Sequence, residues 1–324
     1  MKELSALMGV KHDIRVLDAT MRDGGLVNNF GFSDEFVKAL YETNIKAGVD
    51  YMEFGYRADK EIFPVDQFGK WKYASDDDIR AIVGENNTDL KIGIMADVDR
   101  TDYVNDIRPK NESPVDLIRV ATYVHQIPGA VQMIEDAKKK GYEVSCNIMA
   151  VSKAQEDDIR YSLDALCNTG VDIIYIVDSY GALYHEQIAR IAHLYGEYGA
   201  KYGKQIGMHA HDNQRLAFAN TIESVGDGVN FLDATYDGMG RGAGNCQMEL
   251  LLGFLKNPKY KEYHAIKFVE NYMNPLRASG VKWGYDMQYL VTGLLNEHPR
   301  TAIAFTNEGR SDYTNFYREM AITD

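Results

Sequence analysis

Short apolar runs alternate with longer amphipathic segments along most of this chain. The apolar runs predict strands at 15–21, 51–55, 91–97, 117–124, 143–151, 172–180, 205–212 and 230–236. The segments between them repeat apolar residues at helical spacing, which predicts helices at 33–47, 75–85, 128–140, 155–169, 184–202, 214–226 and 247–256. Eight strands alternating with helices over about 250 residues predict a parallel (β/α)8 (TIM) barrel, with a doubly wound open sheet as the alternative.

The alternation stops before residue 260, so we expect a barrel domain over 1–258 and a C-terminal helical extension over 259–324. Two helical patterns, at 264–279 and 286–296, fall within this extension. We expect the extension to pack on the barrel, where it would either cover the mouth or form a dimer contact.

Two connections, 56–74 and 98–116, are longer than a loop between a strand and its helix requires. A barrel places both at its C-terminal face, where binding and catalytic residues are found. We therefore expect one of them to act as a substrate lid, the alternative being a solvated surface insertion.

The composition is that of an ordinary soluble protein, with 45% hydrophobic and 26% charged residues in 324. A net charge of −13 argues against non-specific binding to nucleic acid or to an anionic membrane, since both require a basic surface. Three widely spaced cysteines indicate neither a disulfide framework nor a cysteine-rich zinc site, and they fit the reducing cytoplasm. The chain shows no signal-peptide pattern, and no apolar run approaches the roughly 20 residues that span a bilayer.

Two histidines close the seventh apolar run and are candidate metal ligands. His209 and His211 point to the same face, because side chains alternate along a strand. Asp23 follows the first run, and a barrel brings the ends of both strands to one face. Two imidazoles and one carboxylate suit Mn, Mg, Co, Zn or Fe(II) and leave positions open for water or substrate. Asp212 is a candidate partner that would orient a ligand ring.

Arg22 and Glu53 are candidate catalytic residues. Arg22 adjoins the candidate ligand Asp23 and carries a permanent charge with a fixed fork of donors, which suits stabilisation of an enolate oxygen. The alternative for Arg22 is a salt bridge to Asp18 or Glu53. Glu53 lies among apolar neighbours on the second strand and therefore requires a partner.

A glycine-rich segment, 238–245, follows the eighth strand. Its backbone N–H groups could cradle an anion, or its glycines could serve a tight turn with positive φ. It is not a dinucleotide fingerprint, which belongs to the first turn between strand and helix. Asn245 at its end is a candidate fourth metal ligand or a contact to substrate.

Five motifs together resemble the metal-dependent (β/α)8 superfamily of carbon–carbon lyases and synthases, which includes 4-hydroxy-2-oxovalerate aldolase, hydroxymethylglutaryl-CoA lyase and isopropylmalate synthase. They are DATMRDGG at 18–25, EFG at 53–55, VDSYG at 177–181, HAHDN at 209–213 and GMGRGAGN at 238–245. The resemblance covers about residues 14–257. In the tail, WGYDMQY at 283–289 and NEHP at 296–299 are similar to the aldolase branch.

The resemblance implies a role for each matching residue. Asp23, His209 and His211 would bind a divalent cation, Mn²⁺ or Mg²⁺ first and Co²⁺ or Zn²⁺ as alternatives. Arg22 would stabilise a pyruvate enolate. Asn245 matches a position that ligates metal in the lyase branch.

The tail and the region after RDG bear on which residue transfers the proton. Tyr289 falls near a tail tyrosine implicated in proton transfer in the aldolase branch. The 4-hydroxy-2-oxovalerate aldolases also have a histidine shortly after RDG, interpreted as the general base, and residues 24–29 of this chain contain none. His12, His125, His298 and Tyr289 are the candidate replacements.

The resemblance implies an enzyme of the lyase class, an aldolase that cleaves or forms a carbon–carbon bond of a 4-hydroxy-2-oxo acid through a metal-bound pyruvate enolate. The alternatives are a Claisen-type synthase that condenses acetyl-CoA with an α-keto acid, and a barrel that binds a ligand without catalysis. We expect a cytoplasmic homodimer, and some aldolase relatives imply a partner aldehyde dehydrogenase that accepts the product.

Overall fold

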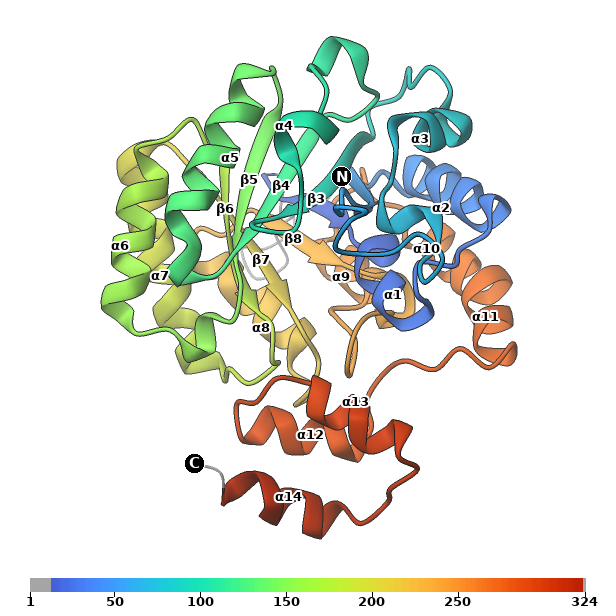
Figure 1. Cartoon of the computed structure of the whole chain (residues 1–324), viewed down its shortest axis with the longest axis vertical. Coiled ribbons are helices and arrows are strands. Elements are labelled where there is room, and N and C mark those ends of the chain that lie inside the picture. Colours follow the sequence, from blue (N-terminus) through green and yellow to red (C-terminus); the bar gives the residue numbers. More distant parts are fainter. Residues whose placement is uncertain (1–12, 323–324) are drawn as a thin grey trace, which may run out of the picture.

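Eight parallel strands close into a barrel in the computed structural model, which describes residues 13–322 (Figure 1). Each strand pairs with the next in sequence, and β8 pairs with β1. This confirms the predicted (β/α)8 barrel and excludes the open sheet. The strands are β1 (Arg15–Asp18), β2 (Tyr51–Tyr56), β3 (Lys91–Asp97), β4 (Leu117–Thr122), β5 (Glu143–Ile148), β6 (Ile173–Asp178), β7 (Gln205–Ala210) and β8 (Phe231–Ala234).

Helices surround the barrel, and they lie close to the predicted positions. They are α2 (Asp34–Ala47), α3 (Asp76–Val83), α5 (Ile127–Lys139), α6 (Glu156–Cys167), α7 (His185–Tyr202), α8 (Ala217–Ser224) and α9 (Met248–Leu255). The two ends of α2 show why the sequence predicted this helix. The Ser33 side chain accepts a hydrogen bond from Phe36 N–H at the start, and Gly48 ends the helix with φ +75°. A short helix, α4 (Tyr103–Asp106), lies in the connection after β3.

The predicted strand at 15–21 is wrong beyond Asp18, because helix α1 (Thr20–Asn28) begins there. The Asp18 carboxylate accepts a hydrogen bond from Thr20 N–H at 2.9 Å and so supports the turn out of the strand. Gly24 and Gly25 concealed this helix in the sequence, since glycine disfavours helix interiors. Here a Cβ at Gly25 would lie 2.2 Å from a ring carbon of Phe30, so close packing requires glycine.

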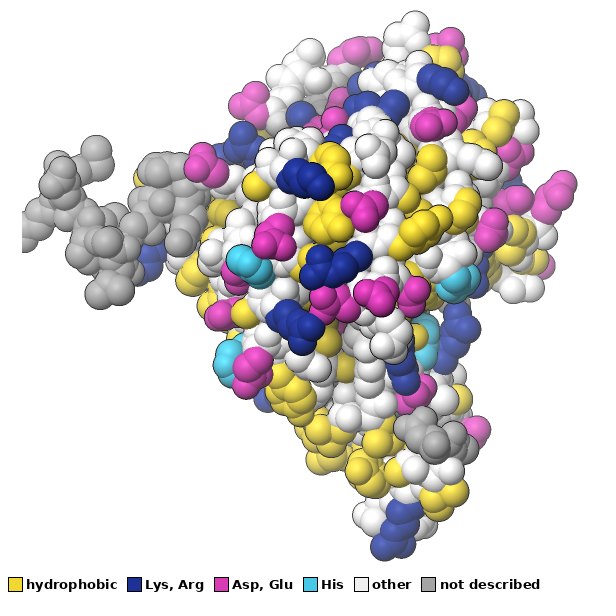
Figure 2. All heavy atoms as spheres, turned by 90° about the vertical axis from the view of Figure 1, so that its left-hand side faces the viewer, with side chains coloured by type: hydrophobic (Ala, Val, Ile, Leu, Met, Phe, Trp, Pro, Cys, Tyr) yellow, Lys and Arg dark blue, Asp and Glu magenta, His cyan; other side chains and the backbone are white. Residues whose placement is uncertain are grey.

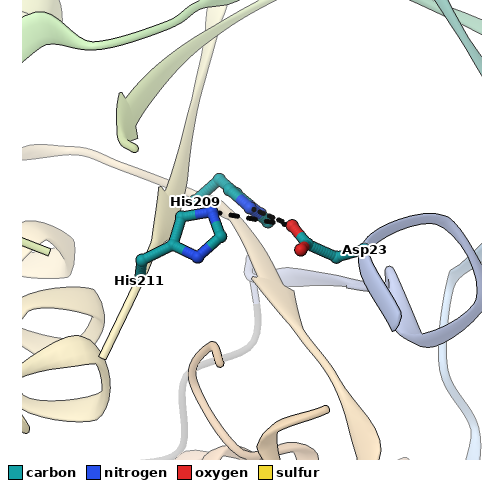
Figure 3. Close-up of side chains that lie close together, drawn as sticks. All are labelled: Asp23, His209 and His211. Carbon is teal, nitrogen blue, oxygen red and sulfur yellow. Dashed lines mark hydrogen bonds and ion pairs between the residues drawn. The ribbon is translucent and has the colours of Figure 1, made fainter. Parts of the chain in front are cut away.

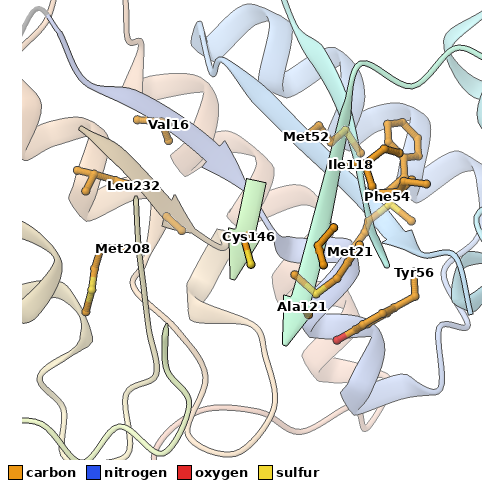
Figure 4. Packing of buried hydrophobic residues seen from close by; sticks show 14 of the residues in the cluster. Val16, Met21, Met52, Phe54, Tyr56, Ile118, Ala121, Cys146, Met208 and Leu232 are labelled. Carbon is orange, nitrogen blue, oxygen red and sulfur yellow. The ribbon is translucent and has the colours of Figure 1, made fainter. Parts of the chain in front are cut away.

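The barrel strands separate two hydrophobic regions, because alternate side chains point outward and inward. Outward side chains such as Val16, Met52, Ile118 and Leu232 belong to the large core between the sheet and the helices (Figure 4). The inward apolar side chains form a smaller cluster of Leu17, Ala19, Tyr51, Leu117, Ile173, Tyr175, Val177 and Phe231. Charged side chains lie farther along β2, β4, β7 and β8 in the barrel interior, toward the C-terminal ends of the strands.

The chain after the barrel forms two groups of helices. The helices α10 (Glu262–Phe268) and α11 (Asn274–Ala278) flank a π-helical turn, and α10 packs on α2 with the Phe36 and Phe268 rings 5.4 Å apart. The helices α12 (Met287–Leu294), α13 (Arg300–Asn307) and α14 (Tyr313–Ala321) share a separate core and lie below the barrel in Figure 1. The predicted division at residue 258 stays a prediction.

The tail helices α13 and α14 were not predicted. They contribute few buried residues, Ala302 and Phe305 from α13 and Phe316 from α14, so their helical repeat is weak in the sequence. The segment before α13 contacts loops at the C-terminal ends of the strands: Lys153 Nζ lies 2.6 Å from Glu297 Oε1, and Asn296 donates to the Ser152 carbonyl at 2.9 Å. The tail therefore packs at the mouth of the barrel.

The outer surface carries both signs of charge. Figure 2 shows Lys and Arg interspersed with Asp and Glu over one face, and apolar side chains gathered toward its lower end, where Figure 1 places α12 to α14. Among residues 13–322, no helix has the length and apolar character that crossing a membrane demands.

Candidate active site

Two arginines and a glutamate form a buried chain of ion pairs inside the barrel. Arg22 comes from the first turn of α1, Glu53 from β2 and Arg119 from the middle of β4. Arg22 Nε lies 2.9 Å from Glu53 Oε2, and Arg119 Nη1 lies 2.8 Å from the same oxygen. Glu53 thus has the cationic partners that its burial required, and the salt bridge considered for Arg22 exists alongside its position in the site.

Three more side chains close this chain into a ring. Arg119 Nη2 lies 2.6 Å from Asp233 Oδ2, and that oxygen lies 2.9 Å from His209 Nδ1. His209 Nε2 lies 3.2 Å from Asp23 Oδ2, which Arg22 Nη1 approaches to 2.8 Å. All six side chains are buried. We call this set, Arg22, Asp23, Glu53, Arg119, His209 and Asp233, the charged ring.

The contact with Asp233 determines which nitrogen of His209 faces the candidate metal position. A carboxylate only accepts hydrogen bonds, so His209 Nδ1 carries the proton and donates to Asp233. Nε2 faces a second carboxylate, Asp23 Oδ2, at 3.2 Å. Burial lowers the pKa of His209, but the hydrogen bonds to Asp23 and Asp233 outweigh it and raise that pKa, so a bound cation would take the place of a proton on Nε2. A carboxylate that orients a histidine in this way is the usual support for a metal-ligating imidazole.

Asp23, His209 and His211 converge on one point, as Figure 3 shows. Their candidate ligand atoms lie within 4.8 Å of one another, and His211 Nε2 is 3.6 Å from Asp23 Oδ2. Donor atoms that bond a cation at about 2.1 Å lie roughly 3 Å apart around it. The distances of 3.2 and 3.6 Å from Asp23 Oδ2 to the two imidazole nitrogens are close to this spacing. The three residues fit a divalent cation by donor type and by spacing.

The electrostatics of Asp23 and His211 favour the protonation states that a metal requires. Burial would raise the pKa of Asp23, but Arg22 and both imidazoles hold it well below its ordinary value. Burial is the main cause that lowers the pKa of His211 to about 3, and the neighbouring cations add to it. Asp23 is therefore anionic and His211 neutral, the forms in which each binds a metal.

Asn245 lies beside Asp23. A Cβ placed on Gly240 would be 2.0 Å from Asn245 Nδ2 and 3.0 Å from Asp23 Oδ1, so the two side chains meet across this glycine. Asn245 Nδ2 donates to the Met239 carbonyl at 3.3 Å, and Oδ1 is buried without a partner in residues 13–322. The glycine-rich segment also donates directly, since Arg241 N–H binds Asp23 Oδ1 at 2.9 Å.

The triad opens into a small cavity, which we call the triad cavity. Its walls include Arg22, Asp23, Leu26, Tyr56, Met95, Ala121, Asn147, Met149, Val177, Ser179, His209, His211 and Arg241. Sequence reasoning gave no role to Tyr56 and missed Arg119 of the charged ring. The signal for Arg119 was present: a charged residue inside an apolar strand run, which is the feature that identified Glu53.

The candidates for proton transfer lie away from the triad cavity. The Tyr289 side chain packs with the tail helices and lines a different surface pocket, with Arg277 and Trp283. His125 stacks on Tyr123, and His298 contacts the Tyr180 ring. Neither histidine lines the triad cavity. His12 lies outside the described residues, and the role of Tyr289 stays a prediction without support from this placement.

The model of the HMGL-like family matches residues 13–271, so the chain belongs to this family. An oxaloacetate decarboxylase of Mycobacterium tuberculosis is 29% identical over 74% of this chain and 69% of its own length. A 4-hydroxy-2-oxovalerate aldolase of Bacillus cereus is 29% identical over 76% and 71%. Both names describe carbon–carbon lyases, which confirms the prediction of a lyase of this family.

A solved structure supports the same assignment. The N-terminal domain of a putative aldolase from Bacteroides vulgatus superposes with a TM-score of 0.76 at 28% identity, covering 90% of this chain and 96% of that chain. The likeness covers nearly the whole chain and therefore extends past the barrel into the tail.

Proposed function

We propose that this protein is a divalent-metal-dependent aldolase that cleaves or forms a carbon–carbon bond of a 4-hydroxy-2-oxo acid, with pyruvate as one product. The observation that carries the proposal is the convergence of Asp23, His209 and His211 next to Arg22 at the barrel mouth. The aldolase names among the relatives add support.

The reaction requires stabilisation of negative charge on the oxygen at C2. In cleavage, a base accepts the proton of the C4 hydroxyl, the C3–C4 bond breaks, and its electron pair moves through C3 to the C2 oxygen as the aldehyde leaves. Protonation at C3 then gives pyruvate. A bound divalent cation, held by Asp23, His209 and His211, would supply Lewis-acid polarisation of the 2-oxo acid.

The residues of the chain supply orientation and protons. Arg22 is fixed by Glu53 and Asp23 on two of its nitrogens, so its charge is in place before the enolate oxygen develops. Tyr56 lines the triad cavity, and burial raises the pKa of its hydroxyl. We propose Tyr56 as the group that protonates C3.

The finer assignments follow from the donor set. Two imidazoles and a carboxylate without thiolate suit Mn²⁺, Mg²⁺, Co²⁺ or Zn²⁺. The resemblance to the aldolases puts Mn²⁺ or Mg²⁺ first in this proposal. Asn245 is proposed as a further ligand because its buried Oδ1 is unpartnered in the described chain. The cytoplasmic location, the homodimer and the aldehyde dehydrogenase partner stay predictions.

Deuterium exchange tests the proposal without knowledge of the aldehyde. Protein in D₂O with Mg²⁺ or Mn²⁺ should incorporate deuterium into the methyl group of pyruvate, measured by mass spectrometry. Asp23→Asn and His211→Ala should abolish both the exchange and the bound metal, while His193→Ala, on the exposed face of α7, should retain both. Exchange that survives chelation, or that Asp23→Asn retains, would contradict the proposal.

The synthase alternative has its own readout. Acetyl-CoA mixed with α-keto acids would release free thiol if the chain catalysed a Claisen condensation. We expect no thiol release under conditions that support pyruvate exchange.

A further inference from the structure

A second cavity of about 300 Å³ adjoins the triad cavity. The two cavities share Leu26, Tyr56, Met149 and Arg241 as lining residues. The second one extends between the connection after β2, which contributes Lys72, and α13 of the tail, which contributes Arg300. We call it the outer cavity. A ligand bound at the triad would reach it with its far end.

The outer cavity concentrates positive charge in an acidic protein. Four cationic side chains line it, from Lys72, Arg100, Arg241 and Arg300, against a single carboxylate, from Asp97. Within residues 13–322, none of the four cations has an ion pair or a hydrogen bond from its side chain. A chain of net charge −13 has many carboxylates to offer, so the absence of partners here points to a ligand that supplies them.

Lys72 shows this most clearly. Its side chain is 6% exposed, and its Nζ lies 4.1 Å from the centre of the Phe63 ring and 4.4 Å from that of Tyr56. These cation–π contacts hold the ammonium group but do not neutralise it. Asp97 lines the same cavity but makes no ion pair with Lys72. A buried cation without a counter-ion in contact is costly, and a bound anion would remove much of that cost.

We infer that the substrate fragment on the far side of the breaking bond carries an anionic group, a carboxylate or a phosphate, which binds in the outer cavity between Lys72, Arg241 and Arg300. The inference rests on the proposed aldolase function and names the class of its second substrate. The aldehyde is thus an oxo acid or a phosphorylated aldehyde. Arg241 connects the two sites, since its backbone N–H binds Asp23 and the residue lines both cavities.

The experiment compares aldehydes of matched carbon skeleton as acceptors for pyruvate. The pairs are 4-oxobutanoate with butanal, and glyceraldehyde 3-phosphate with glyceraldehyde. We expect kcat/KM to be at least about tenfold higher for the charged member of one pair, which is the discrimination that one charge-assisted hydrogen bond provides. The pair that shows the preference distinguishes a carboxylate from a phosphate.

Variants locate the preference in the outer cavity. Lys72→Met and Arg300→Gln should each lower the ratio of charged to neutral kcat/KM by about tenfold. Arg300 is exposed, so its variant is expected to fold even if Lys72→Met does not. Arg318→Gln removes one charge from the exposed surface of α14 and should leave the ratio unchanged.

The outcomes that would overturn this inference differ from the one that would overturn the proposed aldolase function. Equal use of charged and neutral aldehydes overturns the inference, as does a ratio that Arg300→Gln leaves intact. Thiol release from acetyl-CoA that depends on Arg300 also overturns it, because the outer cavity would then hold the phosphates of CoA. Failure of pyruvate deuterium exchange in the unaltered protein would instead overturn the proposed aldolase function.

Discussion

The charged ring and the outer cavity lie next to each other at the barrel mouth. The charged side chains of the ring are paired with one another, whereas those of the outer cavity are not. In the ring, every arginine and carboxylate has a charged partner, and Arg119 alone contacts both Glu53 and Asp233. In the outer cavity, four cations lack such partners within the described chain. Paired charges are fixed before a ligand arrives, whereas unpaired charges gain their partner from it. The comparison separates the residues that organise the reaction from those that select the substrate.

The largest expected effect is on stability, from Arg119→Met in the charged ring. The substitution leaves Glu53 and Asp233 buried with one cationic contact fewer each. Removal of one partner from a buried ion pair costs about 3–5 kcal/mol, so we expect the free energy of unfolding to fall by about that amount. Urea denaturation followed by circular dichroism measures it.

An exposed ion pair provides the control for this substitution. Arg160 pairs with Glu156 on the surface of α6, with its side chain 45% exposed. Arg160→Met should lower the free energy of unfolding by less than about 1 kcal/mol. Equal losses in the two variants would show that the charged ring adds no more to stability than an exposed ion pair does.

Arg22→Lys should affect catalysis more than metal binding. Lysine keeps the charge but loses the fork that contacts Glu53 and Asp23 together. We expect kcat to fall by about 100- to 1000-fold, the usual loss when one stabilising donor is removed from a developing oxyanion. Steady-state kinetics with metal content measured in parallel would check this, and an unchanged kcat would remove Arg22 from the reaction.

Asp233→Asn should weaken metal binding, by a smaller factor than the loss of kcat expected for Arg22→Lys. The carboxylate accepts from His209 Nδ1, and its loss weakens the control of the ring orientation and basicity. We expect metal affinity to fall by about 10- to 100-fold. Titration with Mn²⁺ followed by electron paramagnetic resonance measures the affinity, and an unaltered value would assign Asp233 to stability alone.

The smallest predicted effect is a pH dependence that belongs to the outer cavity. Burial lowers the pKa of Lys72 to about 8, with Asp97 opposing the shift and Arg100 adding to it. Lys72 is charged below that pH and loses its charge as the pH rises through it. We therefore expect KM for the anionic aldehyde to rise several-fold between about pH 7 and pH 9. Lys72→Met should remove this rise, and a rise that persists in the variant would assign it elsewhere.

The sequence predicted the barrel and the convergence of the three candidate ligands because both depend on local periodicity. The period of two placed His209 and His211 on one face, and the order of strands placed Asp23 opposite them. It did not predict α1, whose two glycines serve packing against Met239 and Phe30 rather than a turn. Arg22 and Asp23 therefore reach the site from a helix and not from a strand end.

The outer cavity was beyond sequence analysis for a different reason. Lys72, Arg241 and Arg300 come from segments far apart in the chain, and no motif or period relates them. Their common feature is the lack of an ion-pair partner within the described chain. Only the positions of the neighbouring side chains show this. The lid role for the connection at 56–74 stays a prediction, and Phe63, Phe68 and Lys72 of that connection line the outer cavity.

A crystal grown with Mn²⁺ and examined by anomalous diffraction tests the metal site most directly. We expect one anomalous peak at the barrel mouth, about 2.0–2.3 Å from a carboxylate oxygen of Asp23 and from one nitrogen each of His209 and His211. A Mn²⁺ peak elsewhere in the barrel, or none at saturating Mn²⁺, would contradict the proposed site and the chemistry built on it.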